Sequence, residues 1–397
     1  MDIKYFDNAA TTSLSKEVLD EMLPYLKDNY GNASAIYSIG RDAKKAVEDS
    51  RKKVANAINA NEKEIYFTAS GSEADNTAIR GIAYAYKSKG SHIITSKIEH
   101  PAVLNTCKKL EKEGFEVTYI GVDKNGIIDL EELKNSIKDT TSVISIMFAN
   151  NEIGTIEPIK EITKIAKEHG VIFHTDAVQA VGNVAIDVKD LGIDALSMSA
   201  HKFHGPKGVG ALYVSNKVKF EKLIEGGHQE RNKRAGTENV AGIVGIAKAI
   251  EIATKNLEKN ANHLKELRDY YIKNIEEKIK YVRLNGDREN RLPGNANISF
   301  RFIEGESLLL NLDLKGICAS SGSACTSGSL DPSHVLLAIG LPHEIAHGSL
   351  RISFGTYNTK EDVDYLIDNL VEIITRLRNM SPLYEDFEEG RYKLEEI

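Results

Sequence analysis

Short runs of β-branched residues alternate with amphipathic helical patterns through the first two thirds of the chain. We expect strands over residues 64–68, 92–95, 116–120, 143–148 and 171–174. Between them, residues 102–113 and 159–169 carry apolar side chains at the spacing of helices that pack on a sheet. This βαβ pattern predicts an α/β protein with a large, mixed, mostly parallel sheet that helices cover on both faces.

The pattern changes after about residue 239. We expect helices at 240–259, 264–279 and 307–314, and strands at 297–300 and 350–353. A last helix is expected from Thr359 to about residue 380, because Thr359 and Asp362 have the spacing of a capping box. The C-terminal third is therefore expected to form a smaller α+β unit.

Two domains suit a chain of 397 residues, since domains average roughly 150 residues. We expect a large domain over residues 15–260 and a small α+β domain formed by residues 1–14 and 261–397. The acidic residues 384–389 are expected to form a solvated tail.

The charge of the chain argues against a polyanionic partner. Its 51 Lys and Arg against 58 Asp and Glu give a net charge of −7, and the basic residues are scattered, so we expect no nucleic-acid or membrane surface. No apolar run approaches the roughly 20 residues that span a bilayer, and the first residues do not resemble a signal peptide. The three cysteines form no Cys-x-x-Cys pair, which disfavours a disulfide framework and a zinc site. A cytoplasmic protein without a metal site is expected.

The first candidate site is the stretch 67–76, which follows an expected strand and opens a helical pattern. Its sequence Phe-Thr-Ala-Ser-Gly-Ser-Glu-Ala-Asp-Asn places small residues at a helix N-terminus, where unpaired backbone N–H groups favour a phosphate. A plain βα turn with Ser72 as the N-cap explains the pattern equally well. Both interpretations stay open on these residues alone.

The second candidate site is the stretch 194–210, in which an expected strand ends in small residues and presents Lys202. A turn rich in glycine and proline follows, which a solvated surface lysine would not need. This position predicts a lysine held in a pocket for imine formation.

The sequence Ser-Ala-His-Lys-Phe-His-Gly-Pro-Lys-Gly at 199–208 resembles the pyridoxal-phosphate (PLP) lysine motif of the cysteine desulfurases. These are class-V, fold-type-I PLP enzymes. Similar motifs in family order occur at 6–12, 31–34, 99–103, 150–154, 174–180, 234–239 and 320–328. Two departures are small: residues 31–34 are Gly-Asn-Ala-Ser where the family often has Gly-Asn-Pro-Ser, and Ser72 stands where threonine is common. The resemblance implies a fold-type-I transferase.

The resemblance also implies which residues bind the cofactor. They are Lys202, Gly71, Ser72, His100, Asn151, Asp176, Gln179, Ser199, His201 and Thr237. Lys202 would carry PLP as a Schiff base, and Asp176 would keep the pyridine nitrogen protonated. Gln179 and Asn151 would lie near the ring hydroxyl, and His100 would stack on the ring and move protons. Gly71, Ser72, Ser199 and His201 would hold the phosphate.

Two further residues are assigned by the resemblance. Arg351 is similar to the arginine that binds the substrate carboxylate as a bidentate pair, with Asn151 close by; a structural salt bridge is the alternative for Arg351. Thr237 is similar to the threonine that reaches the partner subunit's cofactor phosphate, which implies a homodimer with shared sites.

The three cysteines differ in their surroundings. Cys107 and Cys318 are expected to be buried as small hydrophobes. Cys325 lies in the uncharged stretch 320–329, composed almost wholly of Ser, Gly, Ala and Thr, which predicts a mobile loop. A loop cysteine without a packing role is a candidate nucleophile.

Together the motifs imply conversion of L-cysteine to L-alanine, with Lys202 or His100 moving the Cα proton. Cys325 would take the sulfur as a persulfide for an acceptor protein, such as an iron–sulfur scaffold. A selenocysteine lyase or a cysteine sulfinate desulfinase shares the cofactor site and remains an alternative. A docking protein that has lost catalysis is a further alternative, which the complete set of Lys202, Asp176, His100, Arg351 and Cys325 disfavours.

Overall fold

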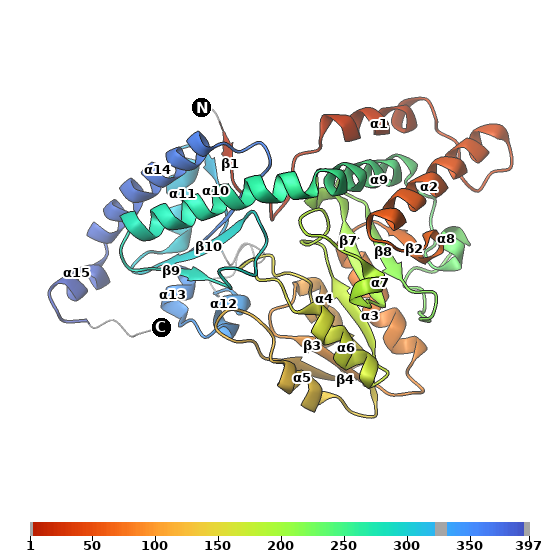
Figure 1. The fold of residues 1–397 in the computed structure, drawn as a ribbon, viewed down its shortest axis with the longest axis horizontal. Coiled ribbons are helices and arrows are strands. Elements are labelled where there is room, and N and C mark those ends of the chain that lie inside the picture. Colours follow the sequence, from red (N-terminus) through yellow and green to blue (C-terminus); the bar gives the residue numbers. More distant parts are fainter. Residues whose placement is uncertain (1–2, 322–331, 393–397) are drawn as a thin grey trace.

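The computed structural model describes residues 3–321 and 332–392. Seven strands form its largest sheet: β2 (Ile65–Thr68), β3 (His92–Ser96), β4 (Glu116–Ile120), β5 (Thr141–Ser145), β6 (Ile172–Asp176), β7 (Ala195–Ser199) and β8 (Gly210–Val214). Their order is β2-β8-β7-β6-β5-β3-β4 (Figure 1). All pairings from β7 to β4 are parallel, whereas β8 is antiparallel to both its neighbours. The expected mixed, mostly parallel sheet is confirmed.

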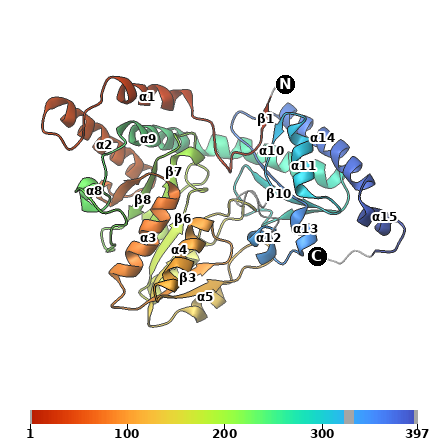
Figure 2. The ribbon, with the colours of Figure 1, turned by 180° about the vertical axis from the view of Figure 1, so that it is seen from behind.

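Helices cover both faces of this sheet. One face carries α3 (Gly71–Ala85) and α4 (Pro101–Lys112), which lie in front in Figure 2. The other carries α6 (Ile159–Glu168) and α7 (Val188–Leu191), and α5 (Leu130–Ser136) lies beside β4. Successive strand residues point to opposite faces, so Ile93 packs beneath α3 and α4 while Ile94 belongs to the core on the other side.

At one end of the molecule, α1 (Lys16–Lys27) and α2 (Ser38–Ala57) pack on α9 (Val240–Lys255). The next helix, α10 (Leu257–Lys278), extends towards the second sheet (Figure 1). The sequence predicted one helix through residue 259, but the structure breaks it at Asn256. The break separates two packing partners, since α9 lies on α1 and α2 whereas α10 contacts α14 (Lys360–Asn379).

The second sheet has three antiparallel strands in the order β12-β10-β9, namely β12 (Ser349–Ser353), β10 (Asn295–Phe300) and β9 (Val282–Asn285). It shares a buried core with α10, α14 and α11 (Gly305–Asp313). The predicted capping box of α14 at Thr359 and Asp362 is confirmed. The N-terminal strand β1 (Lys4–Tyr5) pairs in parallel with β11 (Ile317–Cys318). The expected domain limits stay a prediction.

The remaining elements are short: η1 (Glu62–Glu64), η2 (Ala200–Lys202), α8 (Gln229–Asn232), α12 (His334–Ala338), α13 (His343–His347) and α15 (Pro382–Glu388). The expectation of a solvated acidic tail was wrong over α15. Rings of Tyr384 and Phe387 pack on Phe302 at centroid distances of 5.2 Å each, and Phe387 also contacts Tyr281. These aromatic rings bury apolar area, and the composition argument counted only the charges.

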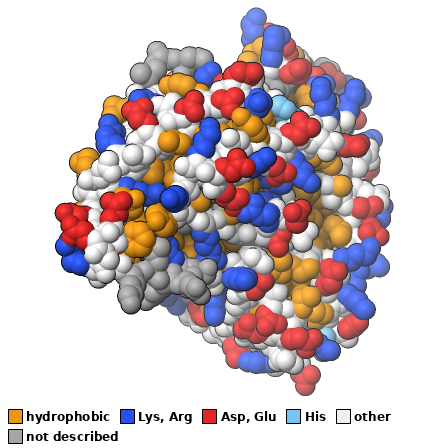
Figure 3. All heavy atoms as spheres, turned by 60° about the vertical axis from the view of Figure 1, so that its left-hand side comes forward, with side chains coloured by type: hydrophobic (Ala, Val, Ile, Leu, Met, Phe, Trp, Pro, Cys, Tyr) orange, Lys and Arg blue, Asp and Glu red, His pale blue; other side chains and the backbone are white. Residues whose placement is uncertain are grey.

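Acidic and basic side chains are interspersed across the face of the molecule in Figure 3, with hydrophobic side chains scattered among them. Across residues 3–321 and 332–392, no helix has both the length and the apolar character needed to cross a membrane.

Candidate active site

A cavity of about 320 Å³ lies where β6 and β7 end and α3 begins, the edge at which open α/β sheets bind ligands. Ten of the residues predicted for the site line it: Gly71, Ser72, His100, Asn151, Asp176, Gln179, Ser199, His201, Lys202 and Arg351. A larger cleft of about 710 Å³ adjoins it and shares Ala9, Gln179 and Lys202. Since that cleft is not lined by Asp176, His100 or Arg351, the reactive side chains converge on the smaller cavity.

The first turn of α3 forms one wall of the cavity. The N-cap is Ser70, whose hydroxyl accepts from the Glu73 N–H at 3.1 Å, so the alternative with Ser72 as the N-cap was wrong. A Cβ at position 71 would lie 2.6 Å from the Val178 side chain and 3.3 Å from that of Ser199. Only glycine therefore allows this close approach, which brings the positive end of the helix dipole to the cavity.

Lys202 ends the turn η2 that follows β7. Its Nζ donates to the backbone oxygens of Ala9 at 2.5 Å and Ala10 at 2.8 Å. The Gln179 side chain donates to the same Ala9 oxygen at 3.0 Å. The N-terminal segment thus holds the lysine amine at the edge of the cavity.

Two carboxyl groups face the cavity from neighbouring elements. Asp176 ends β6 and accepts from the Val178 N–H at 2.9 Å, and Asp75 lies on α3 with 1% exposure. Burial and repulsion by Asp176 raise the pKa of Asp75 well above its usual value. Burial also raises the pKa of Asp176, but His100, the Val178 N–H and Lys202 counteract it. When the pair carries one proton, Asp75 therefore holds it and Asp176 keeps the negative charge.

His100 is the N-cap of α4. Its Nδ1 accepts a hydrogen bond from the Ala102 N–H, which leaves the proton of the neutral ring on Nε2. Burial and the nearby Lys202 lower the pKa of His100, whereas Asp176 raises it. The net direction is downward, so the imidazole is neutral around pH 7.

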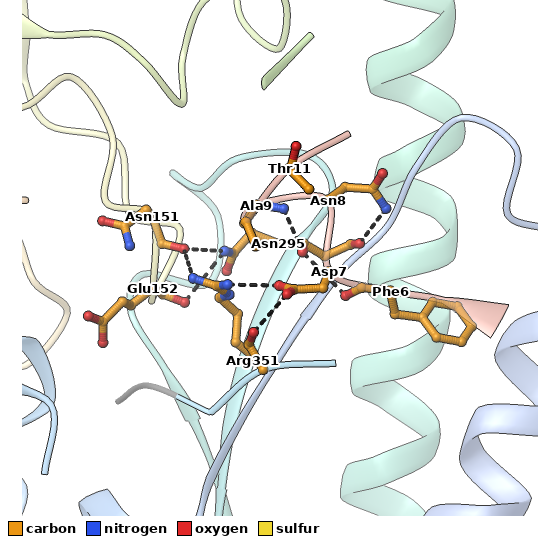
Figure 4. A network of polar contacts seen from close by, with 12 residues as sticks. Phe6, Asp7, Asn8, Ala9, Thr11, Asn151, Glu152, Asn295 and Arg351 are labelled. Carbon is orange, nitrogen blue, oxygen red and sulfur yellow. Dashed lines mark hydrogen bonds and ion pairs between the residues drawn. The ribbon is translucent and has the colours of Figure 1, made fainter. Parts of the chain in front are cut away.

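Arg351 reaches the cavity from β12 and is 3% exposed. Its Nη1 donates to the Asn151 oxygen at 3.2 Å, and its Nη2 binds Asp7 Oδ1 at 2.8 Å (Figure 4). Its Nε is buried and finds no hydrogen-bond partner in the described part of the chain. Arg351 therefore makes the structural salt bridge and also lines the cavity, so the two interpretations are not exclusive.

The cavity lining does not include the other two predicted site residues, and only one of them has a described position. Thr237 is exposed and does not line the cavity, and Cys325 falls outside the described residues. Cys107 is fully buried, as expected, and burial raises its pKa to about 12. Cys318 is only half-buried, which corrects the expectation for it, because the two-residue strand β11 leaves its side chain partly open.

Two acids at the site had no role in the sequence-based prediction. Asp75 lies one turn after Ser72 on a helical face shared with Ala78, Ile79 and Ile82, which all pack inwards. A charged residue in such an inward position was the available signal. Asp7 lies within the motif at 6–12, but its partner Arg351 is 344 positions away and no local pattern indicates it.

Comparison with known proteins assigns the chain to a protein family. The family model described as aminotransferase class-V matches residues 4–366. Cysteine desulfurase IscS of Clostridium botulinum strain Hall is 60% identical over 385 residues, covering 96% of this chain and 97% of that protein. The chain belongs to the cysteine desulfurases of the aminotransferase class-V family. Another member, IscS of Methanosarcina thermophila, is 59% identical over 379 residues, covering 96% of this chain and 94% of that protein.

Solved structures support the same family and fold. A NifS-like protein superposes with a TM-score of 0.89 at 39% identity, covering 94% of this cysteine desulfurase family member and all of that chain. SspA in complex with cysteine superposes with a TM-score of 0.79 at 38% identity, covering 90% of this chain and all of that one. The predicted fold-type-I architecture and the predicted family are thus confirmed.

Cysteine desulfurases are PLP enzymes, and the cavity residues of this member suit that cofactor. The glycine at position 71 lets a helix N-terminus approach closely, as a phosphate requires. Lys202 supplies an amine at the end of β7, and Asp176 supplies a carboxylate at the end of β6. Asp75 Oδ1 is buried without a hydrogen-bond partner among the described residues and lies 3.7 Å from His174 Nε2.

Proposed function

We propose that the protein is a PLP-dependent cysteine desulfurase that converts L-cysteine to L-alanine and retains the sulfur as a persulfide on Cys325. One observation carries this proposal: a single cavity gathers Lys202, Asp176, His100 and Arg351 in a chain of this family. Selenocysteine lyase and cysteine sulfinate desulfinase activities remain the alternatives, and substrate preference separates them.

PLP would be held by Lys202 as a Schiff base, with its phosphate at Gly71, Ser72, Ser199 and His201. When bound, it supplies an electron sink for negative charge at the substrate Cα. Asp176 would keep the pyridine nitrogen protonated, which requires a charged carboxylate. Asp75 supports that charge, because it takes the proton that two adjacent buried acids must share.

Proton movement would fall to Lys202 and His100. The Ala9 and Ala10 backbone oxygens hold the Lys202 amine beside the cavity. In this position the amine would take the Cα proton of the bound substrate. His100 is the second candidate for this step, since its neutral imidazole carries its proton on Nε2. Arg351 would bind the substrate carboxylate and so orient Cα towards these groups.

The sulfur step would belong to Cys325. Its thiolate would attack the substrate sulfur, so that a sulfur–sulfur bond forms and the Cβ–sulfur bond breaks. Cβ would then take up one proton, and Cα would regain the proton that it lost, which gives alanine. An acceptor protein, such as an iron–sulfur cluster scaffold, would then remove the outer sulfur. Neither Cys107, with a raised pKa in the core, nor half-buried Cys318, whose pKa burial also raises, suits this role.

A homodimer would complete the site through Thr237 of the partner subunit. Among the described residues, eight of the fifteen exposed large hydrophobic side chains lie within residues 14–39: Leu14, Leu19, Leu23, Leu26, Tyr30, Ile36, Tyr37 and Ile39. Such a concentration is typical of a protein interface. The turn α8, which precedes Thr237, is fixed to α2 at the same end of the molecule by the buried Arg51–Glu230 ion pair (Figure 1).

The test is incubation of the PLP-loaded protein with L-cysteine and a reductant, with alanine and sulfide measured together. Wild type should release both in equal amounts, and Cys325→Ser should keep the cofactor yet release almost none. Cys318→Ser is the matched control and should remain active. Persulfide trapped on Cys107 or Cys318, or full activity of Cys325→Ser, would contradict the proposal. Preference for selenocysteine or cysteine sulfinate would favour the alternatives.

A further inference from the structure

The motif at residues 6–12 touches three parts of the site, and the reaction described above leaves the side chain of its Asp7 without a role. Phe6 continues the pairing of β1 with β11 through its N–H bond to the Cys318 oxygen. Ala9 and Ala10 hold Lys202 through their carbonyl oxygens. Between these contacts, the side chain of Asp7 turns towards Arg351 (Figure 4).

Both oxygens of the Asp7 carboxylate are engaged. Oδ1 accepts from Arg351 Nη2 and Oδ2 accepts from the Ser320 hydroxyl, each at 2.8 Å. Ser320 and Arg351 are also joined through their backbones, since the Arg351 N–H donates to the Ser320 oxygen at 2.6 Å and the Ser320 N–H donates back at 3.3 Å. The three residues therefore form a closed ring of contacts.

These contacts fix the plane of the guanidinium group. Nη1 is held by Asn151 and Nη2 by Asp7, and a planar fork bound at two nitrogens cannot rotate without losing one bond. Nε remains without a hydrogen-bond partner among residues 3–321 and 332–392, and Arg351 lines the cavity. The Asn151 and Asp7 contacts therefore fix the orientation in which the guanidinium group meets the cavity.

Asp7 is also the main counter-charge of Arg351. The side chains of the pair are 4% and 16% exposed, so solvent screens them little. Glu152 lies nearby, accepts from Ser333, and burial raises its pKa to about 7, so it carries only part of a charge near neutral pH. Removing the charge of Asp7 would leave a buried guanidinium poorly compensated.

We propose that Asp7 is a positioning residue for carboxylate recognition: it holds Arg351 in one orientation at the cavity wall, where the guanidinium group receives the carboxylate of an α-amino acid, and it ties that group to Ser320. This inference rests on the proposed function. It assigns the Phe-Asp-Asn-Ala-Ala motif a role in substrate selection, through Arg351 rather than through direct contact with the reacting atoms.

The test compares L-cysteine with cysteamine, which has the same amine and thiol but no carboxylate. Both are titrated into the PLP-loaded full chain, and apparent affinity is taken from the change in the cofactor absorption band. Asp7→Asn should lower the apparent affinity for L-cysteine by about tenfold, as expected for the loss of one charge-assisted hydrogen bond. Its effect on cysteamine should stay within about twofold, and KM for L-cysteine should rise more than kcat falls.

Asp190→Asn is the matched control, because Asp190 forms an exposed ion pair with Lys160 at 3.0 Å on α7. It should change neither affinity. Ser320→Ala keeps the Asp7–Arg351 pair and should lower the affinity for L-cysteine by a smaller factor than Asp7→Asn does. This second variant keeps the proposal testable if Asp7→Asn does not fold.

An equal loss of affinity for L-cysteine and cysteamine in Asp7→Asn would overturn the proposal, because it would indicate a general disturbance of the cavity. Unchanged L-cysteine affinity in both Asp7→Asn and Ser320→Ala would overturn it as well. The spectral comparison needs no carbon–sulfur cleavage, so a wild-type protein that binds L-cysteine but releases no alanine would contradict the proposed function alone.

Discussion

The Nδ1 atom of His100 accepts a hydrogen bond from the backbone N–H of Ala102 at 3.1 Å. This contact gives one side chain two tasks, since it caps α4 and also fixes which ring nitrogen carries the proton towards the cavity. Substitutions can separate the two tasks, because asparagine is a good N-cap but does not titrate.

His100→Asn should therefore preserve α4 and the link between Lys202 and the cofactor, yet slow alanine formation by about 100-fold if the imidazole moves a proton. Single-turnover measurements of alanine release would determine the rate. His100→Ala, which also removes the cap, should additionally lower the unfolding temperature. Wild-type turnover by His100→Asn would exclude a proton-transfer role.

Lys202→Ala should lose the reducible covalent link to PLP, because no other amine is expected to form the Schiff base. Mass spectrometry after borohydride treatment checks this directly. Lys207→Ala is the control, as Lys207 is exposed in the segment rich in glycine and proline that follows Lys202. Cofactor fixed to Lys202→Ala by borohydride would show that the assignment of the lysine is wrong.

Light scattering should give twice the chain mass of 43.8 kDa if the exposed apolar side chains of α1 form a dimer interface. Leu23→Glu and Leu26→Glu place a charge on that face and should shift the mass towards the monomer. Leu314→Glu adds the same charge at a site that is 73% exposed and should leave the mass unchanged. A fully active wild-type monomer at assay concentration would contradict both the interface and the shared site.

Glu157 should make the folded protein less stable as the pH rises. Burial raises the pKa of this carboxyl from 4.5 to about 8, although the Ile128 N–H donates to it at 3.1 Å. Between these values the unfolded chain has lost the proton and the folded chain keeps it, so the free energy of unfolding falls with increasing pH.

Glu157→Gln removes this titration. Between about pH 5 and pH 8, the unfolding free energy of wild type should fall by roughly 3 kcal/mol more than that of the variant. Urea unfolding at both pH values measures the difference. Glu161→Gln removes an exposed acid and should follow wild type. Parallel pH profiles for Glu157→Gln and wild type would show that Glu157 does not titrate in this range.

Patterns along the chain predicted most elements because strand and helix periodicities are local. The strand at 116–120 and the capping box of α14 are found as predicted. The helix break at Asn256 was misplaced, since it depends on which helices α9 and α10 pack against. The acidic tail was misjudged for a similar reason: its rings meet Phe302, some 80 residues earlier in the sequence.

The sequence by itself determined the family and which residue types the site uses, because motifs such as those around Lys202 and Asp176 are short and contiguous. Only the tertiary structure decided how those residues act on one another. It put Asp75 beside Asp176, Ala9 against Lys202, and Asp7 against Arg351. Each relationship joins elements far apart in the chain, and burial, not local propensity, sets its electrostatic strength.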